Sequence, residues 1–223
     1  MLSPSSSGGY PFRFWTFDNW FNPLTREELD QALIHHWQVS YDNDVERGKS
    51  TSRDFDAMLP ALRTAFIKLR HPDTVEEFKG LMGVPTLTDD PIAHGAGLHL
   101  STYKSFLQAH VDYQRHPHLP DKERRLNAIL FMHDRWEKEW GGDLLLCDMN
   151  GKAIVEIEPK PGRLTLFECG SDSMHGVRVI KEKQAVRLSC AVYYLADTRA
   201  TATRTRAMFL PNRSRGGVPV EVA

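Results

Sequence analysis

The sequence predicts a mainly β (α+β) fold, a double-stranded β-helix or cupin-like jelly roll with supporting N-terminal helices. After Gly97, short apolar runs alternate with Gly, Pro, Asn and Asp, the pattern of many short strands. Before Gly97, apolar residues recur at helical spacing. A chain of 223 residues suits one full core. We therefore expect a single domain, with mostly helical support in residues 1–95, a jelly-roll core in residues 96–196 and an Arg- and Thr-rich segment in residues 197–223.

The first helix is expected over residues 26–37. Thr25 and Glu28 form a capping-box pattern, and Leu29, Leu33 and Trp37 then follow at helical spacing. The polar stretch over residues 42–54 lacks such a period, so we expect a mobile surface loop that could also serve as a lid.

Two further helices are expected before the strands begin. One starts at Pro60, which suits a first helical turn, and must stop before His71-Pro72. The next covers residues 74–82, with Asp73 or Thr74 as its cap and Gly83 just past its end.

Eight strands are expected in the rest of the core. They cover residues 98–102, 106–111, 126–132, 143–147, 153–158, 163–168, 176–180 and 186–195. Residues 153–158 alternate with a period of two, and Asn150-Gly151 before them is a strong hairpin turn. Short strands joined by such turns favour two packed sheets.

Composition and charge exclude several classes of protein. The formal net charge of -1 gives no general reason to bind nucleic acid or an anionic membrane. No apolar run approaches the ~20 residues of a membrane-spanning helix, and the first residues lack the features of a secretory signal. Cys147, Cys169 and Cys190 lie in separate apolar segments, as reduced core thiols do. We expect a cytoplasmic protein with no nucleic-acid or membrane partner.

Three residues form a candidate metal site. His110 and Asp112 end a predicted strand, where residues two apart point to the same face, while Val111 points away. His175 opens a later strand that could lie beside the first in an antiparallel jelly roll. Two histidines and one carboxylate make the ligand set of a non-haem iron(II) site with open positions. Structural zinc would use four protein ligands, usually with cysteine.

Arg187 is a candidate anion-binding residue. It lies in the apolar segment over residues 185–189, and a buried guanidinium must be paired with an anion. Its planar fork can hold a carboxylate with two parallel hydrogen bonds, which a lysine cannot do. A small dicarboxylate is therefore a natural partner.

Several motifs, taken in order, resemble the prolyl-4-hydroxylase-like group of 2-oxoglutarate/Fe(II) oxygenases, of the small bacterial type. They are Pro11-Phe12, Phe17–Phe21, Gly95–His99, Arg124–Trp136, Trp140–Leu144, Glu158–Leu164 with Phe167, Ser173–Gly176, and Arg187–Ser189 ending in Tyr193-Tyr194. The motifs cover nearly the whole chain.

The resemblance implies a dioxygenase that hydroxylates an unactivated C–H bond and releases succinate and CO₂. Its cofactors would be Fe(II), 2-oxoglutarate as cosubstrate and O₂, with ascorbate as a further candidate. His110, Asp112 and His175 match the iron and catalytic triad, and Arg187 matches the oxoglutarate-binding arginine. Ser189 and Asn127 match polar positions near the cosubstrate.

The sequence departs from the resembled group at one position. A tyrosine that donates a hydrogen bond to the oxoglutarate carboxylate is expected near Phe131, which cannot donate one. The missing donor could be replaced by His99, Tyr103 or His133.

Several alternatives stay open at this point. The substrate could be a peptidyl residue, a free amino acid or a small metabolite, and the oligomeric state is unknown. A cupin-like metal- or ligand-binding module and a non-catalytic oxygenase-fold interaction domain are the competing functions. His116-Pro117-His118 offers two further imidazoles but reads as a loop. The segment over residues 198–215 reads as a solvated surface segment.

Overall fold

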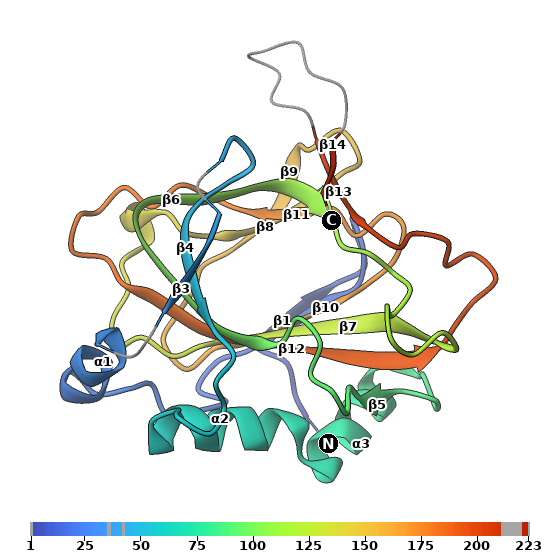
Figure 1. Ribbon diagram of the computed structural model, residues 1–223, viewed down its shortest axis with the longest axis horizontal. Helices are drawn as coiled ribbons and strands as arrows, with labels where there is room; N and C mark the ends of the chain where they lie inside the picture. The colour runs from blue at the N-terminus through green and yellow to red at the C-terminus, as the bar shows by residue number, and fades with distance from the viewer. Residues whose placement is uncertain (1, 35–36, 42, 211–219, 223) are drawn as a thin grey trace.

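The protein is a curled antiparallel sheet that wraps around a central space, with helices packed under one side (Figure 1). The computed structural model describes residues 2–34, 37–41, 43–210 and 220–222. The main path of hydrogen-bonded strands runs β1-β2-β10-β7-β12-β6-β11-β8-β9. This architecture confirms the predicted mainly β jelly roll.

The elements are named in chain order. The helices are α1 (Arg26–Leu33), α2 (Pro60–Arg70), α3 (Pro72–Met82) and the 3-10 helix η1 (Lys138–Trp140). The strands are β1 (Ser6–Gly8), β2 (Phe14–Phe17), β3 (Gln38–Tyr41), β4 (Glu46–Ser52), β5 (Thr88–Asp89), β6 (Gly97–Val111), β7 (Lys122–Phe131), β8 (Leu144–Cys147), β9 (Ala153–Ile157), β10 (Leu164–Glu168), β11 (His175–Val177), β12 (Arg187–Asp197), β13 (Ala207–Phe209) and β14 (Val220–Val222).

The three α-helices overlap the predicted ones, but α1 ends at Leu33, before the predicted end at Trp37. Thr25 and Glu28 cap α1 reciprocally, as the capping-box pattern indicated. Helix α3 begins earlier than predicted, because His71 is its cap and its Nδ1 accepts from the amide of Asp73. Gly83 ends α3 in the left-handed region at φ 66°, which a residue without a Cβ adopts at little cost.

The first 95 residues are less helical than expected, because they also contain β1 to β5. Within the stretch predicted to be a mobile loop, Glu46–Ser52 forms β4, which pairs antiparallel with β6. One residue of that stretch, Asp42, lies outside the described residues. The strand escapes prediction because its side chains are polar on both faces, so it lacks the apolar alternation that marks a strand. Its backbone pairing with β6 holds it in place.

Strand β6 replaces two predicted strands, over residues 98–102 and 106–111. The chain bends at Lys104, whose φ of 66° is uncommon for a residue with a side chain, but it stays in the sheet. Residues 97–101 pair with β12, whereas Leu107 and His110 pair with β11. The long strand therefore crosses from one side of the barrel to the other. Each of the other predicted strands overlaps one of β7 to β12.

The main core lies between the helices and the sheet that contains β7 and β12. Phe78 of α3 meets Tyr194 of β12 edge-on, with ring centroids 5.2 Å apart. The Tyr194 hydroxyl donates to the carbonyl of Leu69 in α2. Because both residues are fully buried, this bond satisfies a polar group inside the core. The helices thus stiffen the sheet from outside the barrel.

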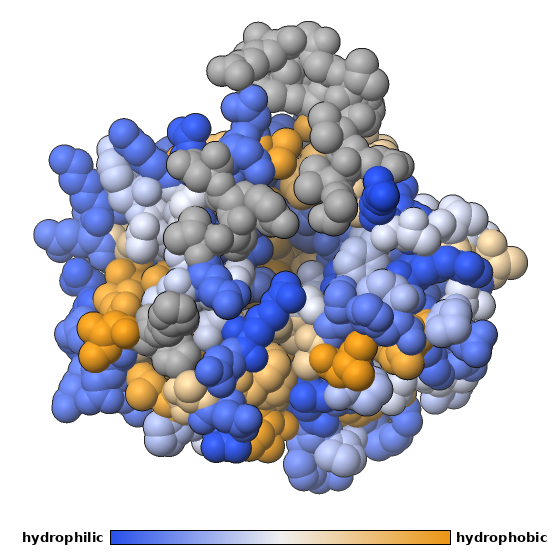
Figure 2. Space-filling model, viewed as in Figure 1, coloured by the Kyte–Doolittle hydropathy of each residue, from blue (hydrophilic) through white to orange (hydrophobic). Residues whose placement is uncertain are grey.

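The cysteines and the surface agree with the sequence interpretation. Cys147, Cys169 and Cys190 are free and buried. Hydrophilic residues cover most of the face seen in Figure 2, with separate patches of hydrophobic residues between them. Among the described helices, none has the length and apolar character to cross a membrane.

Candidate active site

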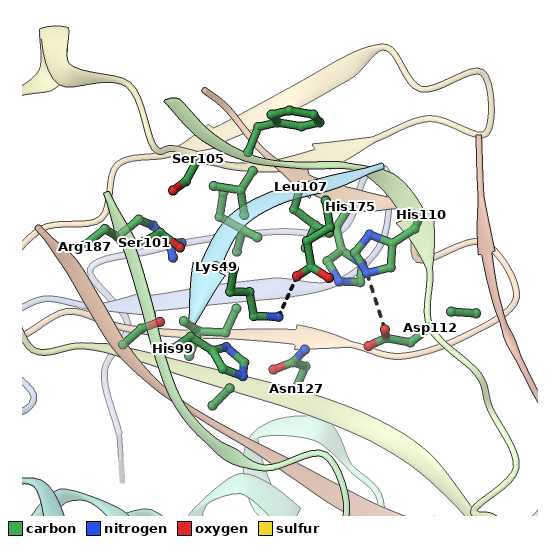
Figure 3. Close-up of a pocket in the computed structure, with 18 of the residues that line it drawn as sticks. Lys49, His99, Ser101, Ser105, Leu107, His110, Asp112, Asn127, His175 and Arg187 are labelled. Atoms are coloured by element: carbon green, nitrogen blue, oxygen red, sulfur yellow. Dashed lines mark ion pairs between the residues drawn. The ribbon is translucent and has the colours of Figure 1, made fainter. Parts of the chain in front are cut away.

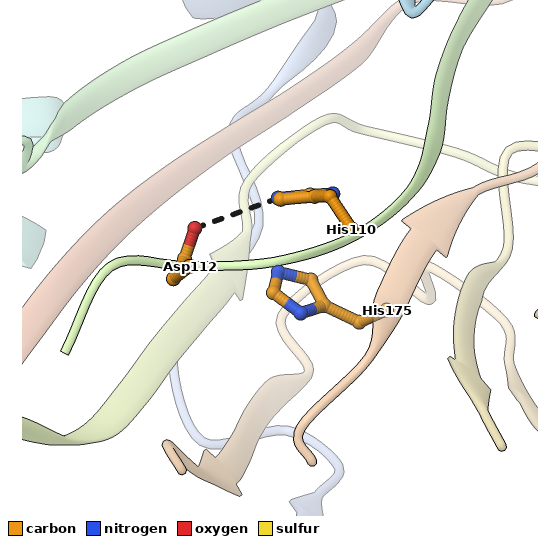
Figure 4. Close-up of side chains that lie close together, drawn as sticks. All are labelled: His110, Asp112 and His175. Atoms are coloured by element: carbon orange, nitrogen blue, oxygen red, sulfur yellow. Dashed lines mark ion pairs between the residues drawn. The ribbon is translucent and has the colours of Figure 1, made fainter. Parts of the chain in front are cut away.

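The histidines and the carboxylate predicted to form a metal site lie together inside the barrel (Figure 4). His110 is near the end of β6, and Asp112 follows that strand directly. His175 opens β11 and is the direct register partner of His110. One ligand atom from each side chain lies within 4.8 Å of the others. Val111 points away into a separate apolar cluster, as the period of a strand requires.

Both imidazoles are held by backbone carbonyls. His110 Nδ1 is 3.0 Å from the carbonyl of Gln108, and His175 Nδ1 is 2.9 Å from the carbonyl of Ser173. A carbonyl can only accept, so each Nδ1 carries its proton and donates. The Nε2 lone pairs are then left for a ligand at the centre, the arrangement that orients metal-bound histidines.

Electrostatics keep Asp112 and His175 in the protonation states that a metal needs. Burial raises the pKa of Asp112, but its contact with His110 Nε2 at 3.5 Å and the nearby His175 and Arg124 outweigh burial and hold that pKa well below its usual range. Burial, followed by the charge of His110, lowers the pKa of His175 to about 4. At neutral pH the site offers one carboxylate and a neutral His175 imidazole.

An unpartnered oxygen atom gives independent support for a divalent metal at this site. Asp112 Oδ2 is buried and has no hydrogen-bond partner among the described residues, although Arg124 Nη1 lies 3.8 Å away. A buried carboxylate oxygen without a partner costs free energy unless something binds it. A metal held by His110, Asp112 and His175 would satisfy this oxygen.

Arg187 lies at the other end of the same cavity, at the start of β12 (Figure 3). It is only 4% exposed. Its Nε donates to the carbonyl of Gly142 at 3.0 Å, and its guanidinium carbon lies 4.9 Å from the ring centre of Phe131. Burial lowers the pKa of Arg187 to about 10, so it stays charged at neutral pH. No carboxylate of the described residues forms an ion pair with it, which leaves the charge to an anionic ligand.

The cavity between the triad and Arg187 has a volume of about 210 Å³. Ser189 and Asn127 both line it, and Ser189 Oγ and Asn127 Oδ1 are buried without hydrogen-bond partners among the described residues. These atoms are placed to contact a ligand that fills the space. Their role next to a cosubstrate remains a prediction.

Of the three proposed replacements for a tyrosine donor at Phe131, only His99 lines this cavity. Tyr103 is 38% exposed and is not among the lining residues. Both ring nitrogens of His133 face backbone carbonyls, those of Leu188 and Pro159. Phe131 itself supports Arg187 through its ring face rather than through a hydrogen bond.

Glu46, Lys49 and Phe209 are among the lining residues that sequence reasoning missed. Glu46 and Lys49 come from β4 and form an ion pair at 3.0 Å over the cavity (Figure 3). Phe209 of β13 stacks on His110, with ring centroids 4.8 Å apart and planes at 14°. The reading of residues 198–215 as a solvated segment is therefore wrong for β13, where the apolar run Met208-Phe209-Leu210 was the available signal. Residues 211–219 lie outside the described residues.

The remaining histidines do not join the triad. His116 is buried and its Nε2 lies 3.2 Å from Asp90 Oδ2, so it has a structural partner. His118 is exposed in the following loop. His35 and His36 lie outside the described residues. Among the described residues, His110, Asp112 and His175 form the one group arranged to hold a metal ion.

Comparison with known proteins agrees with this geometry. Residues 98–195 match the model of the 2OG-Fe(II) oxygenase superfamily. Prolyl 3-hydroxylase 2 of Rattus norvegicus is 32% identical over 75 residues, which are 33% of this chain and 10% of that protein. The matched segment thus spans one tenth of the relative's length.

Solved structures show the same fold. A prolyl-4-hydroxylase from Pseudomonas putida aligns with a TM-score of 0.58 and 15% identity, over 84% of this chain and 93% of that one. A prolyl hydroxylase from Trichoplax adhaerens, in complex with a peptide fragment of the hypoxia inducible factor oxygen degradation domain, aligns with a TM-score of 0.60 and 15% identity, over 82% and 83%. His110, Asp112 and His175 all lie inside the segment that matches the 2OG-Fe(II) oxygenase superfamily model, and the solved structures share the fold of this chain.

Proposed function

We propose that the protein is a hydroxylase that uses Fe(II), 2-oxoglutarate and O₂. His110, Asp112 and His175 would hold the iron, and Arg187 would hold the distal carboxylate of 2-oxoglutarate. One observation carries the proposal: a cavity has three converging candidate metal ligands at one end and, at the other, a buried guanidinium that has no carboxylate partner in the described part of the chain. A dicarboxylate bound to both ends would satisfy the charge at each.

The reaction balances with one cosubstrate and one oxygen molecule. 2-Oxoglutarate loses CO₂ and becomes succinate with one oxygen atom, and the other oxygen atom enters a C–H bond of the substrate as a hydroxyl group. Iron bound there would supply the oxygen activation that no side chain can perform. The carboxylate of Asp112 would be one of its protein ligands, which favours hydroxylation.

The protein residues have defined tasks around that chemistry. The carbonyls of Gln108 and Ser173 orient the two imidazoles, so that each Nε2 faces the metal position. Arg187 gives the cosubstrate one orientation, because its Nε is anchored on Gly142 and Phe131 supports its guanidinium. Ser189 and Asn127 would donate or accept along the length of the cosubstrate.

The substrate proposed for the first tests is a peptidyl prolyl residue. This choice rests on the solved relatives, whose descriptions name prolyl hydroxylases and, in one case, a bound peptide. A free amino acid and a small metabolite are the alternatives, and a panel that contains all three classes will separate them.

The decisive experiment is an anaerobic titration of the protein with Fe(II) and 2-oxoglutarate. A weak visible charge-transfer band should appear only when both are present. A folded protein that binds iron but gives no band would contradict the cosubstrate assignment. That result would favour a cupin-like metal-binding module, and failure to bind either partner would favour a non-catalytic interaction domain.

A further inference from the structure

A second chamber adjoins the metal cavity on the side of β4. Its volume is about 410 Å³. The two spaces share four lining residues, which come from three strands: Glu46, Lys49, His99 and Tyr193. The chamber is therefore continuous with the proposed reaction centre, and neither the iron triad nor Arg187 occupies it.

Three cations and one carboxylate line the chamber: Lys49, Arg53 and Arg124, with Glu46, which pairs with Lys49 at 3.0 Å. Asp112, outside the lining, lies 3.8 Å from Arg124 Nη1. Arg53 is exposed and forms no ion pair with any carboxylate of the described residues. The lining thus carries a positive excess that Glu46 does not cancel. An excess of this kind in a concave site attracts anions.

Arg124 forms a fixed wall of the chamber. It is 3% exposed, and its guanidinium carbon lies 3.7 Å and 3.5 Å from the ring centres of Tyr113 and Tyr193. Its Nη2 donates to the carbonyl of His94 at 3.1 Å. Its Nε and the Tyr113 hydroxyl are buried without a hydrogen-bond partner among the described residues. Such unpaired donors are rare and indicate a bound water or ligand.

Two histidines respond to the same positive field. Burial is the main cause that lowers the pKa of His99, and the charges of Lys49, Arg187 and Arg53 lower it further. Burial is also the main cause that lowers the pKa of His94, and the charge of Arg124 is the next cause. Both histidines line the chamber, so the cations lie close enough to act on a group bound there.

A third space, beside the proposed metal ligands, has a mixed lining and a volume of about 470 Å³. Asp112, Glu46 and Arg206 line it together with the apolar side chains of Val45, Pro117 and Phe209. A substrate would thus find an apolar surface and a cationic chamber on neighbouring sides of the iron ligands. The apolar side suits the carbon skeleton that is to be hydroxylated.

We propose that the chamber over Lys49, Arg53 and Arg124 binds an anionic group of the substrate, a carboxylate or a phosphate. Arg53 and Lys49 select the substrate, and Arg124 is the fixed wall against which the anion rests. This inference builds on the proposed function, because it assigns the bound anion to the molecule that the iron centre hydroxylates. Arg187 keeps the cosubstrate, so the two anions have separate sites.

The test uses three probes of similar shape: phenylacetate, phenyl phosphate and the neutral phenylacetamide. Each is titrated calorimetrically, without oxygen, into the full chain saturated with Fe(II) and 2-oxoglutarate. We expect at least one anion to bind about tenfold more tightly than phenylacetamide, as a charge-assisted hydrogen bond would produce. The tighter of the two anions identifies the group as a carboxylate or a phosphate.

Three variants locate the binding. Arg53→Gln should abolish the preference for the anion, whereas Arg53→Lys should retain most of it. Arg63→Gln is the matched control, because Arg63 is an exposed residue of α2 that does not line the chamber and that pairs with exposed Asp56. Equal binding of all three probes, or a preference that survives Arg53→Gln, would overturn the inference.

The same samples separate this inference from the proposed function. The charge-transfer band of iron and 2-oxoglutarate reports the proposed function before any probe is added. An intact band without anion preference rejects the chamber alone. A loss of 2-oxoglutarate affinity in Arg53→Gln would assign the chamber to the cosubstrate and would also reject the substrate subsite.

Discussion

The Arg187 end and the β4 end of the central space are built in different ways. At the first end, Arg187 and Ser189 lie on β12 inside the barrel, and both are almost fully buried. At the second end, Lys49 lies on β4, which pairs with β6, and Arg53 directly follows that strand; Lys49 is half-buried and Arg53 is exposed. A rigid core at the proposed cosubstrate end and an attached segment at the proposed substrate end would let specificity change without disturbing the catalytic geometry.

The largest effect should follow a change at the metal, where the two ends meet. Asp112→Ala removes one of three ligands and the negative charge that balances the cation. We expect loss of both the charge-transfer band and coupled succinate formation. Asp56→Ala, at a side chain that is 99% exposed, is the control and should behave like the wild-type protein. Full activity in Asp112→Ala would reject the proposed triad.

The next largest effect should come from Arg187→Lys. The charge is kept, but the planar fork that matches a carboxylate is lost. We expect the dissociation constant of 2-oxoglutarate to rise about 10- to 100-fold, the range for a disrupted buried charge pair. Binding of Mn²⁺ in the absence of 2-oxoglutarate should not change, because the triad is untouched. An equal loss of metal affinity would mean that Arg187 supports the fold rather than the cosubstrate.

This contrast also explains what the sequence could predict. His110 and Asp112 are two residues apart on a strand, so their shared face follows from local geometry alone. Arg187 was recognisable because a charge in an apolar segment needs a partner. Both arguments use only neighbouring residues. The triad residues on β6 and Arg187 could therefore be predicted from short stretches of sequence.

The β4 end depends on pairings between distant segments, which no local pattern reveals. Glu46 and Lys49 belong to a polar run without alternation, and only the register with β6 brings them over the cavity. Phe209 reaches His110 because β13 pairs with β6 across about a hundred residues of chain. Contacts of this kind are visible in the folded structure alone.

A moderate effect is expected for Phe209→Ala, which removes the ring stacked on His110. An aromatic pair of this type contributes about 0.5–1.5 kcal/mol, so metal affinity should fall by up to ~10-fold. Titration with Mn²⁺ would measure it. Phe209→Leu keeps the apolar contact and should lose less. No change in either variant would show that β13 covers the site without orienting His110.

The smallest effect concerns His133, which packs behind the Arg187 end and is fully buried. Burial lowers its pKa to about 4, although the carbonyls of Leu188 and Pro159 act in the opposite direction. The unfolded chain therefore binds more protons between pH 4 and about pH 6.5, and the free energy of unfolding decreases as the pH falls through that window. Between pH 7.5 and pH 5.5 this residue should account for ~1 kcal/mol. In urea unfolding, His133→Gln should show a shallower dependence on pH than the wild-type protein. If the free energy of unfolding depends on pH equally in both proteins, His133 is not held neutral by burial. The Arg187 end would then be less rigid than the contrast with the β4 end assumes.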